Sequence, residues 1–383
     1  MSQKVFVIIL ILGLGLNSFA QDAYLNARSE DSEKIYRGGE TYQVGSFPQN
    51  FKSKKPRNVI FLIGDGMGLA QVFAGLTANK GHLFLENFKY TGFAETQSTD
   101  NYITDSAASG TALSTGTRTY NGAIGVDVDK KPLKTILEEA EDKGLSTGLV
   151  STSAITHATP ASFIAHQPDR EMYEEIAADF LKTDIDVFIG GGLNHFTERK
   201  DGKNLVKELE QKGYTVETSW DGLKNIQTGP VAGLLDTMHL GRVSERGDIL
   251  AKATDKAIEI LNKNKKGFFL MTEGSQIDWG GHASSTVYVV EEMLDFDQTI
   301  GEVLKFAAKD KETLVVITAD HETGGMVIIG GSIARGVVRA EFPTTNHTAI
   351  MVPVFAYGPG AEEFTGIMKN TDIHDKIKEL LLN

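Results

Sequence analysis

The sequence predicts an α/β fold, a three-layer sandwich in which a mainly parallel central sheet has helices on both faces. One observation is a series of short, wholly apolar runs, which are typical of strands buried on both faces. A second is the amphipathic, helical pattern of the segments between them. Because parallel strands need crossover connections, this alternation indicates a parallel sheet. We expect a single domain over residues 58–383.

Each expected strand is a short run rich in Val, Ile, Leu and Phe. The strands are predicted at residues 58–63, 147–151, 186–189, 268–272, 314–318 and 352–357. Helices are predicted at residues 133–143, 204–212, 249–262, 286–309 and 372–382. Gly144 and Gly213 follow two of these helices directly, in the position where glycine commonly ends a helix.

The first twenty residues differ from the rest of the chain. Lys4 is positively charged, residues 5–16 are apolar, and Ser18 and Ala20 are small residues at the positions that a signal peptidase reads. The pattern predicts a signal peptide over residues 1–20, cleaved after Ala20. It therefore predicts a periplasmic or secreted protein with no membrane span in its mature form. The alternative is a buried N-terminal strand. Residues 21–57 are polar and irregular, and we expect them to form an N-terminal arm.

The charge balance restricts the partners of the chain. It has 38 Lys and Arg against 51 Asp and Glu, and its net charge of −13 argues against nucleic acid binding. A phosphate ester is also an anion, so a site for one would need bound cations to reverse the local field. The chain has no Cys, and a zinc site would therefore consist of His, Asp and Glu side chains.

Three predicted strands lead into side chains that bind metals. Asp65 follows the first strand, Glu273 follows the strand at 268–272, and Asp320 and His321 follow the strand at 314–318. Ligands gather beyond the carboxyl ends of parallel strands, so these residues could meet at one edge of the sheet. The alternative is that each acid caps the following loop or helix.

Residues 104–112 form a second candidate segment. Thr104 or Asp105 is a suitable helix cap, which would leave Ser106 in the first turn of a helix of small residues. The free N–H groups and positive dipole end of such a turn favour a phosphate or a serine alkoxide. Most serines at this position are only caps, so the segment alone is weak evidence for a nucleophile.

Histidines supply the remaining candidate ligands. Asp278 and His282 are four residues apart and would share one face of a helical turn, an arrangement that suits zinc. Asp320-His321 is a second pair, and His347 lies in a Thr-rich loop. The other histidines without such neighbours are interpreted as surface or core residues; they are His82, His195, His239 and His374.

Taken together, these motifs resemble the alkaline phosphatases. The resemblance rests on five segments in the order of that family: 58–68, 104–109, His157-Ala158-Thr159-Pro160, 273–278 and Thr318-Ala319-Asp320-His321. They span most of the chain after the arm. The resemblance implies hydrolysis of many phosphate monoesters at alkaline pH through a phosphoserine, with inorganic phosphate as product and inhibitor. It also implies a homodimer, which the arm would stabilise by wrapping a neighbour.

The resemblance also implies roles for individual residues. Ser106 aligns with the nucleophile and Arg170 with the arginine that binds the phosphate, although Arg170 could instead be an ion-pairing residue at a helix start. The ligands of one Zn²⁺ would be Asp278, His282 and His347, and those of a second Zn²⁺ would be Asp65, Asp320 and His321. Those of a third site, for Mg²⁺, would be Asp65, Thr159 and Glu273.

The sequence departs from the best-known enterobacterial form at two positions next to these ligands. His157 and Trp279 stand where that form has Asp and Lys. His157 would favour zinc or cobalt at the third site, and Trp279 would weaken phosphate binding. The segment between His321 and His347 is also short, so we expect little or no crown insertion.

Two other functions remain open on the sequence alone. A phosphodiesterase, sulfatase or phosphonate hydrolase of the same superfamily would share most of these motifs. A formylglycine sulfatase that derives its nucleophile from Cys is excluded, because the chain has no Cys. A non-catalytic phosphate- or metal-binding protein is the alternative from a different class, but it would not need Ser106.

Overall fold

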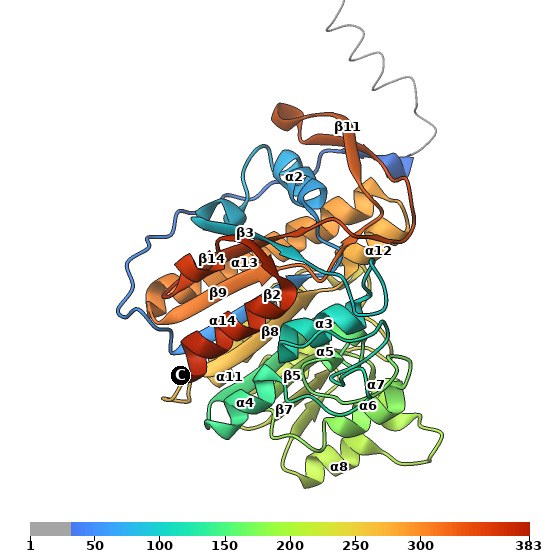
Figure 1. Ribbon diagram of the computed structural model, residues 1–383, viewed down its shortest axis with the longest axis vertical. Coiled ribbons are helices and arrows are strands. Elements are labelled where there is room, and N and C mark those ends of the chain that lie inside the picture. The colour runs from blue at the N-terminus through green and yellow to red at the C-terminus, as the bar shows by residue number, and fades with distance from the viewer. Residues whose placement is uncertain (1–31) are drawn as a thin grey trace, which may run out of the picture.

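A ten-stranded sheet runs through the centre of the computed structural model, which describes residues 32–383 (Figure 1). The predicted signal peptide and residues 21–31 lie outside the described residues. Across the sheet the order is β15 (Gly366–Lys369), β3 (Tyr90–Glu95), β14 (Val352–Tyr357), β9 (Thr313–Thr318), β2 (Asn58–Gly64), β8 (Phe268–Gly274), β4 (Ser146–Ala154), β5 (Val187–Gly191), β7 (Val231–Leu234) and β6 (Thr215–Glu217). Strand β14 is antiparallel to both neighbours, and the other neighbouring pairs are parallel.

All six predicted strands are present, as β2, β4, β5, β8, β9 and β14. The sequence did not predict the other four strands of this sheet. Strands β6, β7 and β15 have only three or four residues each, and β3 alternates between buried and more exposed positions. Strand β7 is apolar throughout but short. The other three lack the continuous apolar run on which the prediction depended.

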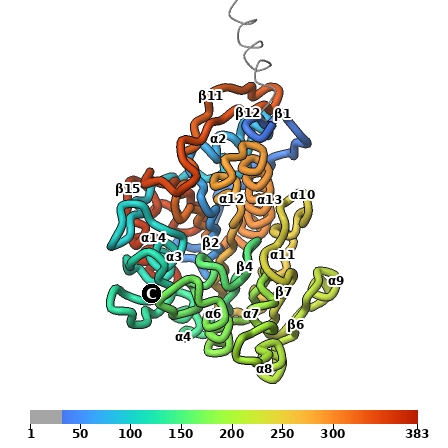
Figure 2. The backbone as a smooth tube through the Cα atoms, turned by 90° about the vertical axis from the view of Figure 1, so that its right-hand side faces the viewer, coloured from blue at the N-terminus to red at the C-terminus, as the bar shows by residue number. Residues whose placement is uncertain are grey.

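Helices cover both faces of the sheet, which confirms the three-layer architecture (Figures 1 and 2). On one face α11 (Ile249–Leu261) and α13 (Thr286–Asp310) pack against β4, β8, β9 and each other. On the other, α4 (Ile136–Asp142), α5 (Ala158–Ala161) and α14 (Asn370–Leu382) contact the sheet, and α3 (Ser106–Thr115) packs on these helices. The remaining helices are η1 (Ser32–Lys34), α2 (Leu69–Ala78), η2 (Phe84–Asn87), α6 (Tyr173–Asp179), α7 (Leu193–Thr197), α8 (Leu205–Gln211), α9 (Trp220–Leu223), α10 (Val243–Arg246), α12 (Gln276–His282), η3 (Ile333–Arg335) and η4 (Ala361–Phe364).

The described part of the predicted arm lies along its own chain. Strand β1 (Ile35–Arg37) joins β12 (Val337–Glu341) and β11 (Val327–Ser332) in a small antiparallel sheet. Further along, the Tyr42 hydroxyl donates to Asp297 of α13 at 2.6 Å, and Tyr357 donates to the Pro48 carbonyl at 2.8 Å. Residues 38–57 therefore contact the central sheet and α13 of the same molecule through hydrogen bonds.

The segment between His321 and His347 is as compact as expected. It contains only β10 (Glu322–Thr323), β11, η3 and β12, and β10 pairs with β13 (His347–Thr348) in a two-stranded ladder. In that ladder Thr323 pairs with His347. The ladder thus brings His347 back to the edge of the sheet where β9 ends.

Candidate active site

The carboxyl ends of β9, β2 and β8 meet at one edge of the sheet. These strands are adjacent, and Ile63 of β2 stands level with Glu273 of β8 and Thr318 of β9. Asp65 directly follows β2, and Asp320 lies two residues after the end of β9. The expected convergence of the three strand ends is therefore present, and it places three fully buried carboxylates together.

Asp278, His282 and His347 form the first candidate metal group. The Nδ1 atoms of the two histidines lie next to backbone carbonyls, 2.6 Å from Thr345 O for His282 and 3.0 Å from Thr104 O for His347. A carbonyl only accepts, so each Nδ1 carries the proton. The two Nε2 atoms lie 3.2 Å apart and face Asp278 at 3.2 and 3.5 Å. This tautomer and orientation are those of histidines that ligate a metal through Nε2.

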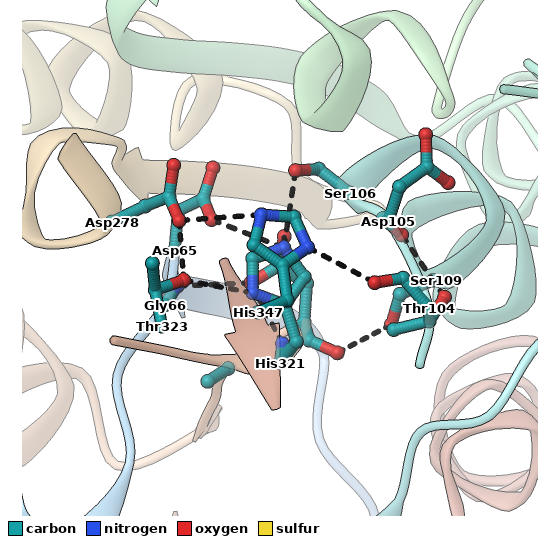
Figure 3. Close-up of polar contacts among 12 residues, drawn as sticks. Asp65, Gly66, Thr104, Asp105, Ser106, Ser109, Asp278, His321, Thr323 and His347 are labelled. Atoms are coloured by element: carbon teal, nitrogen blue, oxygen red, sulfur yellow. Dashed lines mark hydrogen bonds and ion pairs between the residues drawn. The ribbon is translucent and has the colours of Figure 1, made fainter. Parts of the chain in front are cut away.

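Asp65, Asp320 and His321 form the second group. Ser106 lies beside His321 of this group (Figure 3). Nε2 of His321 lies 3.2 Å from Asp320 Oδ2, 3.6 Å from Asp65 Oδ1 and 3.2 Å from Ser106 Oγ. Burial lowers the pKa of His321 and raises the pKa of Asp65. The Ser106 hydroxyl thus lies next to a buried group of side chains that can bind a metal.

The turn that presents Ser106 is the first turn of α3, as predicted. Asp105 is the N-cap, and its Oδ1 accepts from the Ala108 N–H at 2.9 Å. Its Oδ2 accepts from Nη1 of Arg170 at 3.0 Å and from the Gly122 N–H at 3.0 Å. Asp105 therefore both starts the helix of Ser106 and orients Arg170. The sequence identified only its capping role.

The third group consists of Asp65, His157 and Glu273. The resemblance implied Asp65, Thr159 and Glu273 as the ligands of this site, with His157 next to them. In the structure a ring nitrogen of His157 also lies close to the carboxylate oxygens of Asp65 and Glu273. Thr159 is in α5, which packs against β4 and β8, and its buried Oγ1 has no hydrogen-bond partner. Burial raises the pKa of Glu273 to about 7 and lowers that of His157 to about 3.

Buried polar atoms without partners are concentrated in these groups. They include both carboxylate oxygens of Asp65, Oε1 of Glu273, Oδ2 of Asp320, Oγ1 of Thr159 and Nδ1 of His157. Native proteins rarely leave such atoms without a partner, because each lost hydrogen bond costs about 1–3 kcal/mol. Bound cations would satisfy all of them, so the residues present fit the metals that the sequence implied.

The structure reveals two contributors that sequence reasoning missed. The Thr323 hydroxyl donates to Asp278 Oδ1 and lies 3.2 Å from Nδ1 of His321, so it links the first and second groups. Gly66 allows these groups to approach: its φ is +72°, and a Cβ there would lie 2.6 Å from the Asp278 Cα. The Thr323 link spans 45 residues, and no local sequence pattern indicates it.

His239, interpreted as a surface or core residue, lies beside the third group. Its ring is nearly perpendicular to those of Trp279, with centroids 4.9 Å apart, and His157, at 5.6 Å. Its Nδ1 accepts from the Ala154 N–H at 3.0 Å. His195, also set aside, hydrogen-bonds Thr156 at 2.6 Å and stacks on Tyr173. His82 and His374 lie elsewhere, paired with Glu86 and Asp375.

No helix among residues 32–383 is long and apolar enough to cross a membrane.

Comparison with known proteins gives a consistent result. A sequence model of the alkaline phosphatase family matches residues 56–341. Alkaline phosphatase 4 of Bacillus subtilis is 37% identical over 91% of this chain and 94% of its own length. Alkaline phosphatase of Escherichia coli is 32% identical over 88% and 89%.

A solved structure agrees with these sequence matches. Alkaline phosphatase from the Antarctic bacterium TAB5 is 43% identical, covers 85% of this chain and 98% of its own, and superposes with a TM-score of 0.80. Fold, edge geometry and sequence thus point to the same class of phosphoric monoester hydrolase, and the chain belongs to the alkaline phosphatase family.

Proposed function

We propose that this enzyme hydrolyses phosphate monoesters through a phosphoserine formed on Ser106, with two Zn²⁺ and one Mg²⁺ per chain. The observation that carries the proposal is the position of the Ser106 hydroxyl in the first turn of α3, 3.2 Å from Nε2 of His321 in the second metal group. A protein that only bound phosphate or metal would not need a hydroxyl at this point.

The three groups fit different metals. The first and second groups suit zinc. The third has two carboxylates, with the Thr159 hydroxyl as a further expected ligand, and suits Mg²⁺, although His157 makes it more acceptable to a softer ion. When bound, the zinc ions lower the pKa of the Ser106 hydroxyl and stabilise the leaving oxygen. Metal analysis of protein purified without chelator is expected to give two zinc per chain, and a fully active protein without zinc would contradict the assignment.

The chain's own residues bind and orient the phosphate. Arg170 is held by Asp105 at 3.0 Å, and its planar fork can donate to two nonbridging oxygens. Ser106 Oγ loses its proton to solvent and attacks phosphorus, and the bond to the alcohol oxygen breaks. The alcohol takes a proton from water. A water then attacks the phosphoserine, which releases inorganic phosphate and restores the serine hydroxyl. Recognition ends at the phosphate, so we expect a broad substrate range.

Turnover at alkaline pH separates this proposal from its alternatives. The substrates are a chromogenic phosphate monoester, the matching diester and the sulfate ester. We expect fast turnover of the monoester alone. Preferential turnover of the diester or sulfate would indicate another enzyme of the superfamily, and absence of turnover with tight phosphate binding would indicate a binding protein.

We further infer that the enzyme is a periplasmic or secreted homodimer. The described arm packs on its own chain, so it does not itself support dimerisation. Another feature does: α2, β11 and η3 pack together and expose five large apolar side chains, namely Leu69, Phe73, Val327, Ile329 and Ile333. Such a face is typical of an interaction surface. Light scattering at micromolar concentration is expected to give a dimer for the parent and a monomer for Phe73→Glu; a monomeric parent would refute this.

A further inference from the structure

One oxygen of Glu273 is enclosed by serine hydroxyls. Its Oε2 accepts from Ser151 Oγ at 2.6 Å and from Ser275 Oγ at 2.7 Å. Ser153 Oγ lies 2.7 Å from Ser151 Oγ, 3.1 Å from the Ala154 carbonyl oxygen and 3.4 Å from Oε2. All four side chains are buried. Strand β4 supplies Ser151 and Ser153, and Ser275 directly follows β8. The other oxygen, Oε1, is buried and has no partner.

The backbone orients these hydroxyls. The Ser153 N–H donates to Ser151 Oγ and to Ser275 Oγ, at 3.0 Å in both cases. Each of these oxygens therefore already accepts a hydrogen bond, and its single proton is directed to Oε2 of Glu273. A carboxylate that accepts two fixed hydroxyl protons through one oxygen has a defined rotation. Its second oxygen is then presented to the third metal group.

We infer that Ser151, Ser153 and Ser275 are positioning residues that fix Glu273 so that Oε1 is available to the third cation. The inference rests on the proposed third metal site and adds to it the residues that determine its affinity. Neighbours of a metal ligand orient that ligand, and their loss commonly weakens metal binding by 10- to 100-fold. Because the serines contact only one ligand of the third group, the other two groups are expected to keep their zinc.

The test measures metal binding directly. Zinc-loaded parent, Ser275→Ala, Ser153→Ala and the double variant Ser153→Ala/Ser275→Ala are titrated with Mn²⁺, a paramagnetic substitute for Mg²⁺, and free Mn²⁺ is followed by electron paramagnetic resonance. We expect about tenfold weaker binding at the third site in Ser275→Ala, still weaker binding in the double variant, and unchanged zinc content. Ser153→Ala, whose hydroxyl makes the longest contact with Oε2, should weaken binding less and remain informative if the double variant does not fold.

Thr272→Val is the matched control. Thr272 lies on the same strand immediately before Glu273, its hydroxyl is equally buried, and this hydroxyl has no partner. The control should bind Mn²⁺ as the parent does. If the serines only joined β4 to β8, their loss would lower the melting temperature without changing Mn²⁺ affinity, and that result would overturn the inference.

Failure of the inference can be told apart from failure of the proposed function. If the parent hydrolyses phosphate monoesters and all serine variants bind Mn²⁺ as tightly as it does, the positioning role is wrong and the function stands. If the parent binds Mn²⁺ tightly, the variants bind it weakly and no protein turns over a monoester, the positioning role stands and the function is wrong.

Discussion

Asp65 and Asp297 are both completely buried carboxylates, but their surroundings differ. Asp297, on α13, accepts from the Tyr42 hydroxyl at 2.6 Å and from the N–H groups of Phe84 and Leu85 at 2.8 and 3.1 Å. Neither oxygen of Asp65 has a hydrogen-bond donor. Protein donors thus satisfy the carboxylate that anchors the arm, whereas the carboxylate at the edge of the sheet has none and is available to a cation. The difference separates a structural acid from one at a candidate metal site.

Removal of metal should have the largest effect, and it should affect the surroundings of Asp65 but not those of Asp297. Chelation leaves both oxygens of Asp65 and Oε1 of Glu273 buried without a hydrogen-bond partner or cation, so we expect turnover to disappear and the melting temperature to fall. Added zinc and magnesium should restore both. Calorimetry and a monoester assay on the same samples provide the measurement. Full activity after complete metal removal, verified by elemental analysis, would contradict the comparison.

Replacement of Arg170 should have the next largest effect. Arg170→Lys keeps the charge but loses the planar guanidinium, which donates to Asp105 and which we propose donates to two phosphate oxygens. A charged hydrogen bond is worth roughly 1.5–3 kcal/mol, so kcat/KM should fall by about 10- to 100-fold. Arg199→Lys, which alters an arginine paired with Asp201 away from the metal groups, is the control. Equal effects of the two changes would show that Arg170 does not bind phosphate.

The Trp279 position should have a smaller effect, in the opposite direction. Trp279→Lys places an ammonium near the phosphate and should strengthen competitive inhibition by inorganic phosphate about tenfold, which corresponds to roughly 1–2 kcal/mol. Slower release of phosphate should also lower kcat. The double variant His157→Asp/Trp279→Lys also lacks the imidazole of the third group, so its turnover should depend more strongly on added Mg²⁺.

Trp220→Lys controls for the introduction of a lysine in place of a tryptophan elsewhere in the chain. Inhibition constants at fixed pH and saturating zinc and magnesium are the readout. Unchanged or weaker inhibition by phosphate in Trp279→Lys would show that this side chain lies outside the field of the anion.

The smallest effect is expected at Asp297, through pH. Burial raises the pKa of Asp297 to about 7. The folded chain therefore keeps a proton on this carboxyl between about pH 4 and 7 that the unfolded chain has lost, so the free energy of unfolding should fall as pH rises through this window. Asp297→Asn should reduce that slope. Urea unfolding of parent and variant, both metal-loaded, at pH 5 and 8 tests this. Identical slopes would show that Asp297 is ionised in the fold.

The sequence predicted the inner part of this molecule better than its outer part. Strands such as β2 and β9 are recognisable because they are apolar throughout, whereas β6 and β15 are too short to show a pattern. At the site, Asp65 and Asp320 were found because each follows a buried strand. Thr323 and His239 were not, because their contacts join segments that only the fold brings together.

The central claim is the covalent step on Ser106, and trapping the intermediate tests it most directly. Metal-loaded enzyme is incubated with radiolabelled inorganic phosphate at acid pH, where hydrolysis of the phosphoserine is slow, and then denatured and digested. The account predicts one labelled peptide with phosphate on Ser106, no labelled peptide in Ser106→Ala, and loss of most turnover in that variant with fold and metal content retained. Label on another residue, or parent-like turnover by Ser106→Ala, would contradict it.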